Sequence, residues 1–232
     1  MFVVEGVRAV EDLARSPLPI SGALASTDLV RTPRGAELLE LLAARSVEVA
    51  TVSPADFESA AETDSPQGIL AIAATPTHTL AVLDTTDPAR ILVLDAVQDP
   101  GNVGTIVRTA AGLGVTATVA LPGTVDLWNA KVVRSAMGAH FLHPAFHTTW
   151  DELRLFLERS SVPLWGADAR GTPATADAPR RLALAVGNEG AGLTEPVRRY
   201  AERLVSLPLG NGIESLNVAV AASLLLYELR PR

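Results

Sequence analysis

The feature that most constrains the fold is a series of short, wholly apolar segments that alternate with helical patterns from Ile91 onward. Segments such as Ile91–Leu94 and Leu182–Val186 contain no polar residue. Strands of this kind are typical of parallel sheets whose two faces are both covered by helices. The predicted elements are, in chain order, Ile91–Asp95, Gly101–Gly112, Thr116–Leu121, Asn129–Met137, Trp150–Ser160, Leu164–Ala167, Leu182–Val186, Thr194–Tyr200, Arg203–Leu207 and Ser215–Leu229. We therefore predict an α/β fold with a parallel sheet.

The residues before this series predict a separate, small α/β unit. A helical face is formed by Val4, Val7, Val10 and Leu13, and the prolines that follow end that helix. The further elements predicted here are Ile20–Ala25, Gly35–Arg45, Val47–Val52, a helix that starts at Ser53-Pro54, and Ile69–Ala74. Residues 76–90 are rich in proline and threonine and predict a linker, in which Leu80–Leu83 is a candidate short strand. The predicted division is thus 1–75, a linker over 76–90, and 91–232.

Composition excludes several classes of protein. The chain has no cysteine, which excludes disulfide frameworks, thiol nucleophiles and cysteine-ligated metals. Its first residues lack the cationic start and apolar stretch of a signal peptide. The apolar stretch Leu216–Leu226 is interrupted by Asn217 and is too short to span a bilayer. We expect a soluble, cytoplasmic protein with no membrane partner.

The net charge of −7 is unevenly distributed. Residues 1–90 contain 6 arginines against 13 acidic residues, whereas residues 91–232 contain 13 cations against 13 acidic residues. This balance argues against a broad electrostatic grip on nucleic acid, which needs basic clusters. A local basic site stays open, because 18 of the 19 cations are arginine, the side chain suited to bidentate phosphate contacts.

A polar loop follows the first apolar strand, at the edge where α/β sheets bind ligands. It reads DAVQDPGNVGTIVR over residues 95–108. Asp99–Asn102 predicts a turn that feeds a helix N-terminus, where free N–H groups favour anions. Arg108 follows Asn102 by six residues, less than two helical turns, so both side chains could address one site. A simple turn, a helix cap and an exposed arginine are the alternative interpretation.

Two further loops have the same placement. Residues 186–193, VGNEGAGL, have glycines that allow close approach of the backbone to a ligand, and Glu189 adds a carboxylate. Their spacing matches neither a dinucleotide nor a phosphate loop, and a tight turn explains them equally well. In residues 207–217, LPLGNGIESLN, Ser215 is a candidate N-cap for the last helix. Asn217 is either a site residue or a buried amide satisfied within the core.

Two other catalytic patterns are weak. His140, His143 and His147 are spaced like metal ligands, but Pro144 interrupts any helix that would align them and no carboxylates complete the set. We therefore predict no metal site. No serine lies on a G-x-S-x-G turn, which argues against a serine hydrolase.

The three loops in this order are much more specific than any one of them. The segments DAVQDPGNVGTIVRTAAGLGV, KVVRSAMGAHF, LAVGNEGAGL and SLPLGNGIESLNVAVAASLLLYELR resemble the SpoU (TrmH-like) family of RNA ribose 2′-O-methyltransferases, within the SPOUT superfamily. The resemblance covers Ile91–Arg230. Through VEGVRAVEDL and SPQGILAIA, the first third resembles the family's ribosomal-protein-like substrate-recognition domain. The resemblance implies a trefoil-knotted α/β domain, S-adenosylmethionine bound in the knot, and a homodimer whose interface includes the active sites.

The resemblance also implies roles for individual residues. Those that match the cofactor-binding positions are Gly187, Leu207 and Leu216. Those that match the catalytic and ribose-orienting positions are Asn102, Arg108, Glu189, Ser215 and Asn217. Because arginine stays protonated in proteins, we expect Arg108 to act electrostatically and not as a free base. Glu189 is as readily a loop-structuring carboxylate as a substrate contact.

The expected activity is S-adenosylmethionine-dependent methylation of a ribose 2′-hydroxyl in structured RNA, with ribosomal RNA favoured and transfer RNA as the alternative. A non-catalytic RNA- or ribosome-binding module and an unrelated nucleotide-phosphate enzyme are the rival hypotheses. Because the first domain is acidic, Arg134, Arg198 and Arg199 are the candidates to bind RNA. The alternative is that RNA binds to a basic stretch, common in the family, that precedes this sequence.

Overall fold

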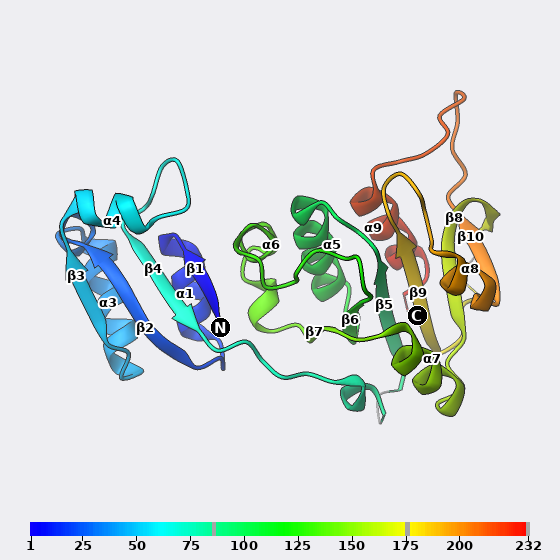
Figure 1. Cartoon of the computed structure of the whole chain (residues 1–232), viewed down its shortest axis with the longest axis horizontal. Helices are drawn as coiled ribbons and strands as arrows, with labels where there is room; N and C mark the ends of the chain where they lie inside the picture. Colours follow the sequence, from blue (N-terminus) through cyan, green and yellow to red (C-terminus); the bar gives the residue numbers. More distant parts are fainter. Residues whose placement is uncertain (85–86, 175–176, 231–232) are drawn as a thin grey trace.

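The first part of the chain folds around a four-stranded sheet. The computed structural model describes residues 1–84, 87–174 and 177–230 (Figure 1). The elements of this part are β1 (Phe2–Glu5), α1 (Val7–Arg15), β2 (Ile20–Ser26), α2 (Thr27–Val30), α3 (Pro33–Ala44), β3 (Val49–Val52), α4 (Pro54–Ala60) and β4 (Ile69–Ala73). The strand order is β1-β4-β2-β3; β4 is antiparallel to β1 and β2, and β3 is parallel to β2. The small α/β unit predicted from the sequence is confirmed.

The second part forms a six-stranded sheet, reached through the 3-10 helix η1 (Leu80–Leu83). Its elements are β5 (Ala89–Asp95), α5 (Pro100–Gly112), β6 (Ala117–Ala120), α6 (Ala130–Ala136), η2 (Ala139–Phe141), β7 (Ala145–His147), α7 (Trp150–Arg159), β8 (Leu164–Pro173), β9 (Arg181–Gly187), α8 (Glu195–Tyr200), β10 (Arg203–Ser206) and α9 (Val218–Glu228). The strand order is β10-β8-β9-β5-β6-β7, and every neighbouring pair is parallel. The parallel sheet predicted from the apolar segments is confirmed.

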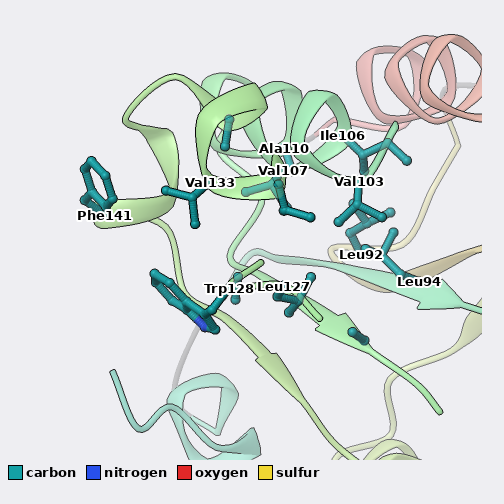
Figure 2. Close-up of a cluster of buried hydrophobic side chains, with 14 of the residues drawn as sticks. Leu92, Leu94, Val103, Ile106, Val107, Ala110, Leu127, Trp128, Val133 and Phe141 are labelled. Atoms are coloured by element: carbon teal, nitrogen blue, oxygen red, sulfur yellow. The ribbon is translucent and has the colours of Figure 1, made fainter. Parts of the chain in front are cut away.

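Both faces of the second sheet are buried, as alternate residues of β5 illustrate. Leu92 and Leu94 belong to a hydrophobic cluster with α5, α6 and α9, where Figure 2 shows them near Ile106. Ile91 and Val93 belong to a second cluster, with α7 and α8 on the opposite face. All of β5 is buried. A strand without a solvent-facing side needs no polar residue, which is why it reads as an unbroken apolar run.

The start of the chain differs from the prediction. Val4 was assigned to a helical face, but Phe2–Glu5 is the strand β1, which pairs with β4. The helix begins only at Val7, because the backbone turns at Gly6. The pattern of valines misled the prediction, since a strand followed by a helix also places Val4 and Val7 in the core.

Three later boundaries also differ. Leu80–Leu83 forms the 3-10 helix η1 and not a strand; the Thr79 hydroxyl accepts a hydrogen bond from the Ala81 N–H at its start. β5 begins at Ala89, inside the segment expected to be a linker. The histidine-rich segment, for which no element was predicted, contains the edge strand β7. Within the described residues, no helix is both long and apolar enough to cross a membrane.

Two arginines hold the ends of helices by donating to main-chain carbonyls. Arg90 is only 5% exposed, and its Nε donates to the Leu229 carbonyl at the end of α9, at 2.6 Å. Its Nη1 donates to the carbonyls of Pro179 and Arg180 at 2.7 and 2.9 Å. Arg45 likewise donates to carbonyls at and just beyond the end of α1. A cation at a helix C-terminus satisfies free carbonyls and interacts favourably with the helix dipole.

The two sheets are joined by a small aromatic cluster. The Phe2 ring lies 4.5 Å from the Trp128 ring and 6.1 Å from the Phe141 ring, measured between centroids. The His140 ring meets the Trp128 ring edge-on at 4.4 Å. All four side chains are buried. Figure 2 shows Trp128 and Phe141 at one end of the core of the second part, so β1 extends that core into the first part.

Arg90 provides a test of the helix clamp. Arg90→Met leaves the carbonyl oxygens of Leu229, Pro179 and Arg180 without this donor, and we expect the free energy of unfolding to fall by about 3 kcal/mol. Urea unfolding followed by circular dichroism measures the change. Arg31→Met is the control, because the Arg31 side chain is 80% exposed; its effect should stay below about 0.5 kcal/mol. Equal losses in the two variants would contradict the clamp.

His140 makes the junction sensitive to acid. Burial, with a smaller effect of the nearby His143, lowers the pKa of His140 to about 4. Since the unfolded chain titrates near the ordinary value of 6.5, stability is complete above that pH and is lost as the pH falls toward 4. We expect His140→Phe to spare about 2 kcal/mol of the stability lost between pH 7 and pH 4.5. Unfolding curves that lose stability equally in both proteins would contradict this assignment.

Candidate active site

Two of the three loops line one large cleft. Its volume is about 1170 Å³, and it lies at the carboxyl ends of β9 and β10, beside β8. This is the edge of a parallel sheet at which ligands collect. The predicted site residues that line it are Gly187, Glu189, Arg198, Leu207, Ser215 and Leu216. In Figure 1 the loop between β10 and α9, coloured orange to red, rises from this end of the sheet.

Gly187 ends β9 where another part of the loop crosses it. A Cβ on Gly187 would lie 2.2 Å from the carbonyl carbon of Gly192 and 2.4 Å from the nitrogen of Leu193, closer than real Cβ atoms come. Asn188 and Gly192 exchange two main-chain hydrogen bonds of 2.9 Å that close the loop. The close approach therefore requires glycine at position 187, and the loop presents main chain to the cleft.

A chain of side-chain hydrogen bonds connects all three loops. Glu189 Oε1 accepts from Asn102 Nδ2 at 3.1 Å, and Asn102 Oδ1 accepts from Asn217 Nδ2 at 3.0 Å. The Glu189 carboxylate also accepts from the main-chain N–H groups of Gln98 and Asp99, at 3.4 and 3.2 Å. The expectation that these distant segments converge is confirmed. Asn102 and Asn217 themselves lie beside the large cleft and do not line it.

Glu189 is held in its ionised form. Partial burial raises the pKa of Glu189, but hydrogen bonds from the Asn102 side chain and from neighbouring main-chain N–H groups outweigh burial and lower the pKa below its usual value. A carboxylate accepts only, so it forces the NH₂ group of Asn102 toward itself and the amide oxygen toward Asn217. The charge on Glu189 therefore sets the direction of the Asn102 amide, and the Asn217 amide is oriented to match it.

The cap of α9 corrects the prediction for Ser215. The helix begins at Val218, and the Asn217 side chain accepts from the N–H groups of Ala219 and Val220 at 2.9 and 3.3 Å. Asn217 is therefore the N-cap, and Ser215 lies in the exposed loop two residues earlier. The alternative of a buried Asn217 amide is also wrong, because the residue is exposed. Asparagine and serine are both good caps, so the sequence alone could not choose between them.

Sequence reasoning missed Asp95 and Asn188. Asp95 is 1% exposed and accepts from the N–H and hydroxyl of Thr194, at 2.7 and 3.1 Å, which fixes the start of α8 to the end of β5. Burial raises the pKa of Asp95, and the bonds from Thr194 oppose this shift. Asn188 Nδ2 donates to the Ala96 carbonyl at 3.0 Å. The sequence does contain a signal for both residues, because each is a polar residue that directly follows the apolar core of a strand.

The predicted arginines differ in their surroundings. Arg108 on α5 and Arg134 on α6 are exposed, and neither side chain makes a hydrogen bond or ion pair with a residue that the structure describes. Arg198 pairs with Asp168 in the wall of the large cleft. Arg199 pairs at 2.6 Å with the glutamate four residues before it, away from the cleft. Arg108 and Arg134 are thus free to bind an anion.

The histidine-rich segment has structural contacts of its own. His140 belongs to the aromatic cluster, and His143 Nε2 lies 2.8 Å from the Thr118 hydroxyl. His147 Nε2 accepts from the Leu127 N–H at 3.1 Å. Across residues 1–84, 87–174 and 177–230, no group of three histidine, cysteine, aspartate or glutamate side chains is placed to hold a metal ion.

Fold and site together define an α/β protein with a ligand cleft at the carboxyl ends of a parallel sheet, preceded by a smaller α/β unit. Residues 89–227 match the model of the SpoU rRNA Methylase family. Residues 3–79 match the model described as RNA 2′-O ribose methyltransferase substrate binding. The chain belongs to the SpoU rRNA methylase family.

Individual relatives agree with this assignment. The chain is 35% identical to 23S rRNA (guanosine(2553)-2′-O)-methyltransferase RlmP of Bacillus subtilis, over 99% of this chain and 88% of the relative. It is 34% identical to 23S rRNA (guanosine-2′-O-)-methyltransferase RlmB of Bordetella pertussis, over 70% and 69% of the two chains. The crystal structure of the SpoU methyltransferase AviRb from Streptomyces viridochromogenes, in complex with AdoMet, superposes with a TM-score of 0.87. It is 28% identical and covers 98% of this chain and 88% of that one.

The loop after β9 provides a matched pair of glycines for a test. Gly187→Ala forces the crossing segment to move, and we expect the free energy of unfolding to fall by about 1–3 kcal/mol. Gly190→Ala in the same loop is the control, since the nearest atom to its Cβ would be 3.7 Å away. The control should be unchanged or slightly stabilised. Thermal unfolding of both variants measures this, and a harmless Gly187→Ala would show that the crossing is not required.

Proposed function

We propose that this protein transfers a methyl group from S-adenosylmethionine to a ribose 2′-hydroxyl of structured ribosomal RNA. The observation that carries the proposal is the hydrogen-bond chain from Glu189 through Asn102 to Asn217, which lies next to the large cleft. Its middle residue, Asn102, is on α5, the helix that also bears Arg108. The relatives named as 23S rRNA methyltransferases favour ribosomal over transfer RNA. The alternative of a non-catalytic RNA-binding module is disfavoured, because such a module would not need the side-chain amides of Asn102 and Asn217 to be held in fixed orientations.

The chemistry of the cleft fits S-adenosylmethionine. Leu207 and Leu216 provide apolar surface for an adenine ring, and Gly187 brings main chain to the wall of the cleft. Glu214 and Arg170 also line the cleft, with charges that suit the ammonium and carboxylate groups of the methionine moiety. The solved AviRb complex with AdoMet supports this assignment. When bound, S-adenosylmethionine supplies an electrophilic methyl group on a sulfonium.

Arg108 stabilises the charge that develops on the RNA. It follows Asn102 by six residues on α5, a rise of about 9 Å, and has no partner in the described chain that would neutralise it. Its guanidinium is a fork that can grip the phosphate beside the target ribose. It also stabilises negative charge on the 2′-oxygen as the new O–C bond forms. The 2′-hydroxyl proton passes to the gripped phosphate, because a protonated arginine cannot accept it.

The two amides and a hydroxyl orient the ribose. Asn102 and Asn217 each keep one N–H that is not used in the hydrogen-bond chain, and their directions follow from the charge on Glu189. Ser215, in the loop between β10 and α9, lines the cleft and adds a hydroxyl group. An in-line displacement depends mainly on alignment of the attacking oxygen with the methyl carbon. These donors supply that alignment.

We also propose that the protein is a homodimer formed through α9. Val220, Leu224 and Tyr227 are 47%, 46% and 54% exposed and recur at the spacing of one helical face. An apolar stripe of this kind on a soluble surface marks an interface. α9 packs on α5, so a second copy at this stripe would lie close to the helix that carries Arg108.

The remaining expectations form part of the same proposal. They are the trefoil knot, the division into residues 1–75, 76–90 and 91–232, and location in the cytoplasm with the ribosomal substrate. The strand order supports a threaded chain, because β10 ends at one edge of the sheet whereas α9 packs back against β9 and α5. Among the RNA-binding candidates, exposed and unpaired Arg134 is favoured over Arg198 and Arg199, which have carboxylate partners.

Methyl transfer and the role of Arg108 can be tested together. We expect a 2′-O-methyl group to be absent from ribosomal RNA of cells that lack the gene, and to be restored by the purified protein with S-adenosylmethionine. Arg108→Ala should lower kcat about 100-fold or more, since it removes the charge that stabilises the reacting oxygen. The Kd for S-adenosylmethionine should change little, because Arg108 does not line the cleft. Arg154→Ala, on the surface helix α7, is the control.

Four results would contradict parts of this proposal. Identical methylation maps with and without the gene would overturn the ribosomal substrate, and methyl transfer to transfer RNA alone would replace it. Competition between nucleotides and S-adenosylmethionine in a thermal-shift titration would favour the nucleotide-phosphate alternative. Near-normal turnover of Arg108→Lys would mean that a point charge suffices, whereas loss of turnover with intact cofactor binding would leave both the forked geometry and base chemistry as explanations.

A further inference from the structure

A second, smaller cleft lies at the junction of the two parts of the chain. Its volume is about 290 Å³, near the lower limit for small-ligand sites. Arg8 and Asp12 of α1 form one wall with the loop before β4, and Arg134 and Met137 at the end of α6 form the other. In Figure 1 the junction lies between α1 and α6, and the loop before β4 rises on the same, upper side of the view as the loop between β10 and α9.

Three charged side chains of this junction cleft lack hydrogen-bond partners in the protein, whereas a fourth, Glu5, accepts from the Glu62 N–H and the Thr63 hydroxyl. Within the described residues, the side chains of Arg8, Asp12 and Arg134 make no hydrogen bond and no ion pair. Gln67 uses its amide oxygen to accept from the Val7 N–H at 2.9 Å, which leaves its NH₂ group without a protein acceptor. Apart from Glu5, whose carboxylate is already engaged, two cations, one anion and one amide donor are therefore available to a ligand.

The walls of the junction cleft are held in place before any ligand binds. The contact of Phe2 with Trp128 packs the two parts together beside it, and the Gln67 hydrogen bond ties the loop before β4 to α1. Met137 has a φ of 50°, a left-handed conformation that glycine or asparagine usually adopts at a helix end, and its side chain is 47% exposed. Such conformations concentrate at ligand sites, and this one accompanies a long apolar side chain that lines the cleft.

The charges of the cleft select the chemistry of its occupant. Phosphate groups would satisfy Arg8 and Arg134, but a phosphate is repelled by Asp12, which needs an N–H donor. An unstacked nucleotide offers both, since its backbone is anionic and guanine, adenine and cytosine bases carry amino groups on their edges. Methionine and guanidinium groups can cover the faces of such a base. RNA proteins commonly recognise unpaired nucleotides in this manner.

We propose that the junction cleft binds one unpaired nucleotide of the RNA substrate, different from the nucleotide that is methylated. The amino-bearing edge of its base lies on Asp12, its face on Met137, and its phosphates on Arg8 and Arg134. The cleft is a substrate-recognition site and takes no part in methyl transfer. The inference rests on the proposed function in one respect only, namely that structured RNA is the substrate.

The sign of a charge change tests the proposal. If Asp12 is only a negative surface charge, Asp12→Asn should tighten RNA binding by removing repulsion; if Asp12 accepts from a base, the same change should weaken it. We expect the Kd for ribosomal RNA from cells lacking the gene to rise about tenfold. Asp28→Asn is the control, because the Asp28 side chain is 68% exposed and lies outside the cleft. Its Kd should be unchanged or slightly lower.

Chemical footprinting locates the nucleotide. Dimethyl sulfate and kethoxal modify the edges of unpaired bases, so the wild-type protein should protect a base other than that of the methylated nucleotide. Asp12→Asn and Met137→Asn, which suits the left-handed backbone, should both lose that protection while their thermal midpoints and Kd for S-adenosylmethionine stay unchanged. Protection that persists in both variants, or an unchanged or tighter Kd for Asp12→Asn, would overturn the proposal.

The binding measurements distinguish this inference from the proposed function. Both are made without S-adenosylmethionine, so they do not depend on methyl transfer. A protein that binds and protects ribosomal RNA but transfers no methyl group would overturn the proposed function, and the variants would still decide the role of the cleft. Methyl transfer that proceeds with an unchanged KM for RNA in both variants would overturn the cleft alone.

Discussion

The carboxylate of Glu189 is the constraint on which the reaction site depends. It accepts main-chain N–H groups of the loop after β5, and it sets the direction of Asn102, which in turn sets the direction of Asn217. Three segments that are distant in the sequence are thereby joined by polar contacts at the surface, in addition to buried side chains such as Val97 and Leu193 that anchor two of them in the core. A site built in this way can stay exposed to a large substrate and still present its donors in one orientation.

The rest of the molecule supplies fixed edges for this chain of contacts. Buried Asp95 fastens the start of α8, directly after the loop of residues 186–193, to the end of β5. Arg90 fastens the end of α9 to the other end of the same strand. Phe2 packs on Trp128, so the first part of the chain is seated on the second and not merely tethered to it. The large cleft and the junction cleft therefore keep a fixed relation, which suits recognition of a folded RNA at more than one point.

The charge distribution is consistent with selective and not general binding. The acidic excess in residues 1–90 weakens non-specific attraction to a polyanion. Three exposed arginine side chains have no partner in the described chain and belong to the proposed RNA contacts. Arg8 and Arg134 line the junction cleft, and Arg108 lies on α5, the helix that also carries Asn102. Affinity then has to come from a few directed contacts with phosphates and base edges, and an RNA without the matching shape gains little from long-range attraction.

The sequence by itself determined the parallel sheet, the helices around it and the placement of three polar loops at one edge of the sheet, because burial on both faces of a strand leaves a pattern that can be read locally. The tertiary structure alone decided that Asn217 and not Ser215 caps α9, that Phe2–Glu5 is a strand, and that Asp95 binds Thr194 at the start of α8. Each of these depends on a partner that local sequence does not specify. Hydrophobic periodicity is a property of neighbouring residues, whereas the partner of a polar group is fixed only when the whole chain has folded.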